Sequence, residues 1–169
     1  MTLEKLQKFF PDATEDTWHR HPNGDGWVEN TATVEKHAYV GPNAIVSGNA
    51  WVLDKAQIMC NAHVMDDAII SDTAEISGHA KVFGSARVAD NTWIFDQAMI
   101  FDDARIFQDA RVYGNAWVSG KARVSGNTFI FGEIEIDGNF QSSADVKISG
   151  TAQCGGILQI SANLKNSGS

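Results

Sequence analysis

The stretch ARVYGNAWV, at residues 110–118, contains the pattern that decides the fold of this chain. Val112 and Val118 stand six residues apart, and Ala116 lies four positions after the first of them. The stretch AIVSGNAWV, at residues 44–52, has the same arrangement at the same phase. Glycine and asparagine lie between valine and alanine, and both are typical of tight turns. The pattern therefore indicates a short extended segment followed by a sharp corner.

This period of six residues continues from Val28 to Ile160 without a change of phase. Of its 23 positions, 21 hold Val or Ile, and only Ser142 and Cys154 depart from the rule. Four positions after each, Ala occurs in 16 of the 23 hexads. A fixed period of this length is typical of repeat architectures, in which stacked units bury a continuous core. We predict an all-β fold with Val, Ile and Ala facing the axis and their neighbours facing outward.

The two quoted stretches resemble the hexapeptide-repeat proteins, which fold as single-stranded, left-handed parallel β-helices. The resemblance covers residues 27–165 and implies three hexads per coil, a triangular section and seven to eight coils. Uninterrupted arrays of this kind are similar to small bacterial and bacteriophage-borne proteins, many of them labelled transferases. We expect residues 1–26 to form an N-terminal cap with a short helix over residues 2–10, and residues 166–169 to form a tail. Leu158 and Leu164 should close the C-terminal end.

Composition excludes several classes of protein. A net charge of −8 speaks against a binder of duplex nucleic acid, which usually has a basic face. The chain has no apolar run as long as a membrane helix and no apolar leader, so we expect a cytoplasmic protein that does not bind membranes. Two cysteines provide neither a disulfide framework nor a zinc cluster. His19 and His21 form a His-x-His pair, but two histidines are weak support for a metal site, and we expect none.

Residues 18 apart should stack, so outward side chains sort into three faces, named here after their first inward residues Val28, Val34 and Val40. The outward aromatic residues are not needed for the core, and contiguous apolar patches of this size are rare on soluble monomers. We therefore expect a homo-oligomer, either a trimer, as is usual in the family, or a face-to-face dimer. The alternative is that stacked rings only strengthen neighbouring strands. The expected interface residues are Trp93, Phe95, Arg111, Tyr113, Phe129 and Phe131 on the Val40 face, and Phe83, Phe101 and Trp117 on the Val28 face, where Ile45 and Met65 also point outward.

Charged residues are sorted as well. Arg87, Arg105 and Arg123 should form a column on the Val34 face, about 5 Å apart. Like charges at this spacing repel one another unless they meet an anion, so we predict a site for a phosphate-bearing or other anionic ligand, with pairing to Asp103 as the alternative. Most acidic residues fall at corners, either because aspartate suits turns or because the row imitates a polyanion.

Two functional classes survive these observations. The first is a non-catalytic scaffold that self-associates through its faces and binds or sequesters a protein or anionic ligand, for example a bacteriophage-borne inhibitor of a host system. The second, implied by the resemblance, is an acyl-CoA-dependent acyltransferase at subunit junctions, with acetyl-CoA as cosubstrate and His79 or His63 as general base. The unbroken hexads, without the extruded loop common in such enzymes, favour the scaffold, for which we expect no catalytic residue and no cofactor.

Two other uses of β-helices are discarded. The γ-class carbonic anhydrases, which the fold also resembles, need zinc-binding histidines about two coils after the first. No histidine follows His79, and Asn115 stands at the corresponding position. Ice binding needs ranks of outward threonine, whereas these faces have aromatic residues and arginine.

Overall fold

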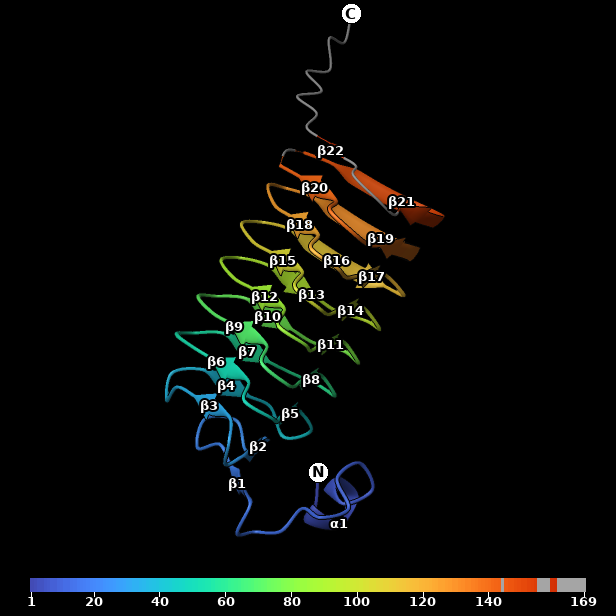
Figure 1. Ribbon diagram of the computed structural model, residues 1–169. Coiled ribbons are helices and arrows are strands. Elements are labelled where there is room, and N and C mark those ends of the chain that lie inside the picture. Colours follow the sequence, from blue (N-terminus) through green and yellow to red (C-terminus); the bar gives the residue numbers. More distant parts are fainter. Residues whose placement is uncertain (144, 155–158, 161–169) are drawn as a thin grey trace, which may run out of the picture.

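A computed structural model places the chain in an all-β parallel solenoid of about seven turns with a very short N-terminal helix (Figure 1). It describes residues 1–143, 145–154 and 159–160. The expected fold class is therefore confirmed. Neighbouring strands pair with a partner 18 residues away, as in Trp93 with Arg111 and Val88 with Ile106. In the part of the chain that the structure describes, no helix is long and apolar enough to cross a membrane.

Most strands are two residues long, and they stack into three ladders. The Val28 face contains β2 (Trp27–Glu29), β5 (Ile45–Val46), β8 (His63–Val64), β11 (Lys81–Val82), β14 (Met99–Ile100) and β17 (Trp117–Val118). The Val34 face contains β3 (Thr33–Val34), β6 (Trp51–Val52), β9 (Ile69–Ile70), β12 (Arg87–Val88), β15 (Arg105–Ile106), β18 (Arg123–Val124), β20 (Gln141–Ser142) and β22 (Gln159–Ile160). The Val40 face contains β4 (Tyr39–Val40), β7 (Gln57–Ile58), β10 (Glu75–Ile76), β13 (Trp93–Ile94) and β16 (Arg111–Gly114).

The core is the inward column of the hexads. Val88, Ile94 and Ala98 are typical members, and none of the three has any exposed surface. Their neighbours Trp93 and Arg87 are exposed, as strand alternation requires. The inward orientation predicted from the period is therefore correct for this column.

The corners depend on residues that tolerate the left-handed backbone region. Asp90 has a φ of 61°, and the equivalent Gly84 has a φ of 67°. Such corners suit glycine, because it has no Cβ, and aspartate, because its short side chain bonds locally. The carboxylates of six corner aspartates with positive φ also accept a hydrogen bond from a backbone amide of the next coil, as when the Gln108 amide donates to Asp90 at 2.8 Å. The six are Asp54, Asp66, Asp72, Asp90, Asp96 and Asp102. These contacts explain the acidic corners as structural features.

The last coils are built differently. β19 (Phe129–Ile136) and β21 (Lys147–Cys154) each run as one strand from the Val40 face onto the Val28 face. Ile134 takes the place of the usual corner alanine, so the inward position must hold a larger side chain. One hexad onward, Phe140 is fully buried and Ser142 is 2% exposed. The expected exchange of a large residue for a small one therefore occurs inside the core, while Leu158 and Leu164 lie outside the described residues.

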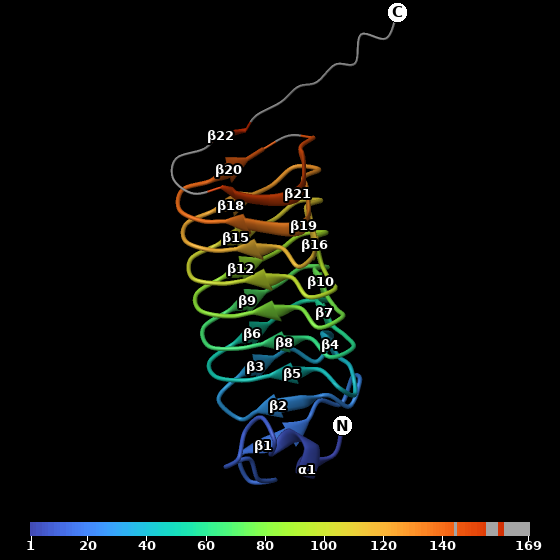
Figure 2. The same ribbon diagram turned by 90° about the vertical axis from the view of Figure 1, so that its right-hand side faces the viewer.

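The N-terminal segment lies at the end of the solenoid where the first coil begins (Figure 1). The helix α1 (Leu3–Leu6) is shorter than predicted and lies beside β1 at the lower end of the solenoid (Figure 2). Its Leu6 packs with Trp27 and Ile45 on the outward side of the Val28 face. The open edge of β2 is covered by β1 (Trp18–Arg20) of the same segment, which pairs antiparallel with it. Ile45, expected to be an outward interface residue, is therefore fully buried within the protomer.

Candidate functional site

The Val40 face has the largest ordered group of aromatic side chains. β13, β16 and the first half of β19 place them in three consecutive coils, because residues 18 apart pair in register. The outward positions before each inward aliphatic residue form one column, and those after it form a second. The first column contains Trp93, Arg111 and Phe129, and the second contains Phe95, Tyr113 and Phe131.

The second column is a continuous stack of rings. The centroids of Phe95 and Tyr113 lie 4.6 Å apart, and those of Tyr113 and Phe131 lie 4.8 Å apart, with each pair within 5° of parallel. This spacing equals the distance between neighbouring strands, so the backbone ladder alone places the rings in contact. The stack therefore holds three half-buried rings rigidly at the surface.

The first column alternates rings with a cation. The Arg111 guanidinium lies 4.6 Å from the Trp93 ring centroid and 5.2 Å from that of Phe129. Cation–π contacts of this kind stabilise a partly exposed arginine by about 0.5–1 kcal/mol. Trp93 still has 42% of its surface exposed. The predicted interface residues of this face are thus assembled into one surface, although each ring has used only part of its contact area.

The Val28 face is divided into two parts. Its upper part contains the stacked pair Phe83 and Phe101, with centroids 5.0 Å apart, and Trp117, which is 45% exposed. Its lower part is covered by the N-terminal segment described above. The structure therefore leaves the three expected aromatic residues free, but a smaller free apolar patch on this face than the sequence indicated.

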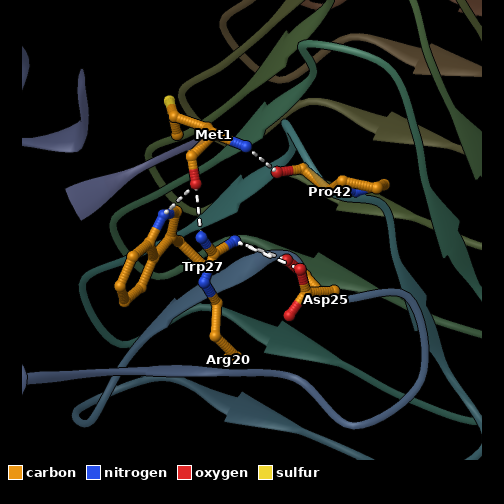
Figure 3. Close-up of polar contacts among 5 residues, drawn as sticks. All are labelled: Met1, Arg20, Asp25, Trp27 and Pro42. Atoms are coloured by element: carbon orange, nitrogen blue, oxygen red, sulfur yellow. Dashed lines mark hydrogen bonds and ion pairs between the residues drawn. The ribbon is translucent and has the colours of Figure 1, made fainter. Parts of the chain in front are cut away.

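A set of contacts at Met1 fixes the N-terminal segment to this face (Figure 3). The Met1 nitrogen donates to the Pro42 carbonyl at 2.7 Å, and the Met1 carbonyl accepts from Trp27 Nε1 at 3.2 Å. The Arg20 guanidinium also donates to the Met1 carbonyl and lies 4.0 Å from the Trp27 ring centroid. Asp25 pairs with Arg20 at 3.8 Å. These contacts bind the segment firmly to the first two coils.

A cavity of about 520 Å³ lies where this segment meets the Val28 face. It brings together His63 and His79, the two predicted candidate bases, which come from adjacent coils. The Phe9 ring stands edge-on to the His63 imidazole, with centroids 5.7 Å apart. Burial lowers the pKa of His63 from its ordinary value, and the nearby Lys81 and His79 lower it further. The cavity is lined by Met1, Phe9, Phe10, Asn43, Asn61, His63, Met65, His79 and Lys81.

Sequence reasoning missed the role of Phe9 in this cavity. The sequence signal that could have indicated it is that Phe9 is apolar but lies outside the apolar helix side formed by Leu3, Leu6 and Phe10. Phe9 is 61% exposed, the most exposed of the large apolar side chains in the described residues. An imidazole with a lowered pKa is neutral at physiological pH, so His63 can accept a proton there.

The arginine column of the Val34 face forms as predicted. Arg87 pairs in register with Arg105, and Arg105 with Arg123, and all three side chains are exposed. Within residues 1–143 and 145–151, the only ion pair is between Arg20 and Asp25. The pairing of Arg105 with Asp103 that we considered is therefore absent, and three like charges stand together without a counterion.

The His-x-His pair has local structural contacts. His19 Nδ1 lies 2.8 Å from the Asn30 side-chain oxygen, and His21 is buried with Nδ1 3.1 Å from the Asn23 carbonyl. Across the described residues, no three metal-ligating side chains gather into a cluster. Both histidines therefore fix the loop that precedes the first full coil.

The fold and these surfaces define a protein of the parallel β-solenoid class. Comparison with protein families adds a match to the model described as YdcK Beta solenoid repeat, at residues 104–120 and 110–126. The chain is similar to this repeat over these residues, and the matched segment includes β16, from which Arg111 and Tyr113 project. No curated protein matches the chain in sequence.

Proposed function

We propose that this protein is a non-catalytic scaffold that self-associates through the Val40 face and binds an anionic ligand or partner. The observation that carries the proposal is the pair of ordered columns described above, in which six aromatic or cationic side chains are held rigidly and remain partly exposed. Rigid aromatic residues lose little conformational entropy on association and are enriched at the centres of interfaces. A second copy of the chain is the occupant that completes their burial.

The arginine column supports the binding role. Three exposed guanidinium groups about 5 Å apart repel one another, and an anion relieves that repulsion. Arginine also binds phosphate and carboxylate groups with two parallel hydrogen bonds, which favours such ligands over simple halides. The hexads of the described coils continue without an inserted loop, so a ligand would lie along the Val34 face rather than in an enclosed cleft.

The mass of the assembly in solution tests self-association. Phe95→Asp and Phe131→Asp place a charge within the ring stack, and each variant should reduce the mass measured by light scattering to that of a monomer. Phe107→Asp is the matched control, because Phe107 occupies the same hexad position on the Val34 face. An unchanged mass for both Val40-face variants would exclude this face as the contact.

A second candidate function rests on the cavity at His63. A neutral imidazole beside His79 and Lys81 suits general-base catalysis, and this supports an acyl-CoA-dependent acyltransferase. The arginine column that would bind the cosubstrate phosphates lies on a different face of the same protomer, so this function requires a junction between subunits. Acetyl-CoA should then raise the melting temperature of the wild type but not of Arg105→Ala. Sodium tripolyphosphate in the same assay separates general anion binding from recognition of the thioester.

A further inference from the structure

The order of charges along the Val40 face specifies how two copies can meet. Glu75, Trp93 and Arg111 occupy the same outward position in three consecutive coils, because β10, β13 and β16 pair in register. Within the described residues, the Glu75 carboxylate has no ion pair or hydrogen bond, although the side chain is half-buried. Arg111 lies against the rings of Trp93 and Phe129 and forms no ion pair in the part of the chain that the structure describes. An acid and a base thus lie one coil below and one coil above Trp93, each without a counterion.

The surface beside Trp93 is hollowed on both sides. A cavity of about 300 Å³ is bounded by Trp93, Phe95 and Glu75, and another of about 380 Å³ is bounded by Trp93, Arg111 and Glu75. Trp93 therefore projects between two depressions that reach the Glu75 carboxylate. Large aromatic side chains of this kind are frequent at the centres of stable interfaces, and an axis at the level of Trp93 brings the two Trp93 side chains to the centre of the contact.

The possible symmetries of a face-to-face contact differ in what Glu75 meets. A two-fold axis parallel to the solenoid keeps coils at the same level and exchanges the two outward columns, so Glu75 would face Ser77 of the other copy. That arrangement removes two charges from water without pairing them, which is costly. A two-fold axis along the strand direction reverses the order of the coils. If that axis passes at the level of Trp93, Glu75 of each copy faces Arg111 of the other.

We propose that the protein forms an antiparallel homodimer through the Val40 face, with the two-fold axis at Trp93 and two reciprocal Glu75–Arg111 ion pairs. This inference rests on the proposed self-association and adds its partner, orientation and register. The same register places Met59 of one copy against Phe131 of the other, so an apolar residue meets an apolar residue at the outer coils. Shifting the axis by one coil, to Arg111, would bring the two Arg111 side chains together.

Charge reversal tests the register directly. Glu75→Lys should give two Lys–Arg contacts in a homodimer, and Arg111→Glu should give two Glu–Glu contacts. We expect each variant alone to dissociate at least tenfold more readily than the wild type. An equimolar mixture of the two variants should form a one-to-one dimer, because every contact in that pair joins opposite charges. The double variant should dimerise on its own for the same reason.

Native mass spectrometry distinguishes these species by mass, with Glu15→Lys as a control for net charge outside the face. A mixture that remains monomeric, or single variants that dimerise like the wild type, would overturn the antiparallel register. A wild-type trimer would overturn it as well. If Phe95→Asp also leaves the mass unchanged, the proposed self-association fails together with the register. Dissociation of Phe95→Asp without rescue in the mixture rejects the register alone.

Discussion

His63 has a side chain whose protonation depends on its position in the fold. Burial, followed by Lys81 and His79, lowers its pKa in the folded protein, whereas the unfolded chain keeps the ordinary value near 6.5. The unfolded state therefore binds a proton first as the pH falls. By linkage, this residue reduces stability progressively below about pH 6.5 and has no such effect above it.

His63→Gln should remove this pH dependence. Between about pH 7.5 and about pH 5.5, the melting temperature of the variant should fall less than that of the wild type. His37→Gln, at an exposed corner, is the matched control and should behave as the wild type. Phe9→Ala should raise the pKa of His63 toward its ordinary value in an NMR titration, because the ring beside the imidazole is lost. An unchanged pKa would mean that the ring does not cause the burial.

Asp90 tests the role of the corner carboxylates. Ala at this position would have to adopt a φ near 61° and would lose the bond from the Gln108 amide. We expect Asp90→Ala to reduce the free energy of unfolding by about 1–3 kcal/mol, measured by urea denaturation. Asp90→Asn keeps both the turn preference and an acceptor oxygen, so its unfolding should remain close to that of the wild type. Equal losses in both variants would show that the negative charge of the carboxylate, rather than the turn preference, stabilises the corner.

At the scale of single elements, the last coils show how the core tolerates a break in the pattern. Ser142 replaces an inward aliphatic residue, and its hydroxyl lies 3.1 Å from that of Thr128, which also donates to the Ser125 carbonyl. Phe140, two residues away on the same strand side, supplies the volume that serine lacks. The exchange therefore conserves core volume and satisfies the polar group.

Phe140→Ala should reduce the free energy of unfolding by about 3–5 kcal/mol, because removal of the buried ring leaves a large cavity in the core. Ser142→Val alone should also destabilise, since it crowds Phe140 and removes a partner of Thr128. The double variant restores the regular hexad and should be more stable than the sum of the two losses predicts. Urea denaturation of the four proteins measures this coupling, and simple additivity would show that the two positions do not compensate.

Features that repeat within each hexad, such as which side chains face inward, could be predicted from the sequence. Features that depend on how segments outside the repeat pack against the coils could not. Val88 faces inward and Trp93 outward because the strand period decides both. Leu3 and Leu6 indicated an apolar helix side, but no period relates them to Trp27 or Ile45, so the wall on which they pack was not predictable. The meeting of His63 and His79 followed from the stacking of coils, whereas the cover provided by Phe9 required the position of the helix.

At the scale of the whole molecule, the three faces of the solenoid differ in what they expose. The Val34 face contains unpaired arginines, the Val28 face is half-covered by its own N-terminal segment, and the Val40 face has both ring columns free. A dimer through the Val40 face leaves the arginine column of each copy accessible, because that column lies on another face. Assembly and anion binding are therefore compatible in one molecule.

Self-association also links stability to concentration. Unfolding of a dimer releases two chains, so a tenfold rise in protein concentration should raise the melting temperature by about 2 °C for a dimer of this size. Phe95→Asp should melt at a temperature that does not depend on concentration, because the monomer unfolds alone. Phe107→Asp should keep the dependence of the wild type. Scanning calorimetry over a hundredfold range of protein concentration measures all three dependences. If the melting temperature of the wild type stays constant and its native mass is that of a monomer, the dimer is excluded.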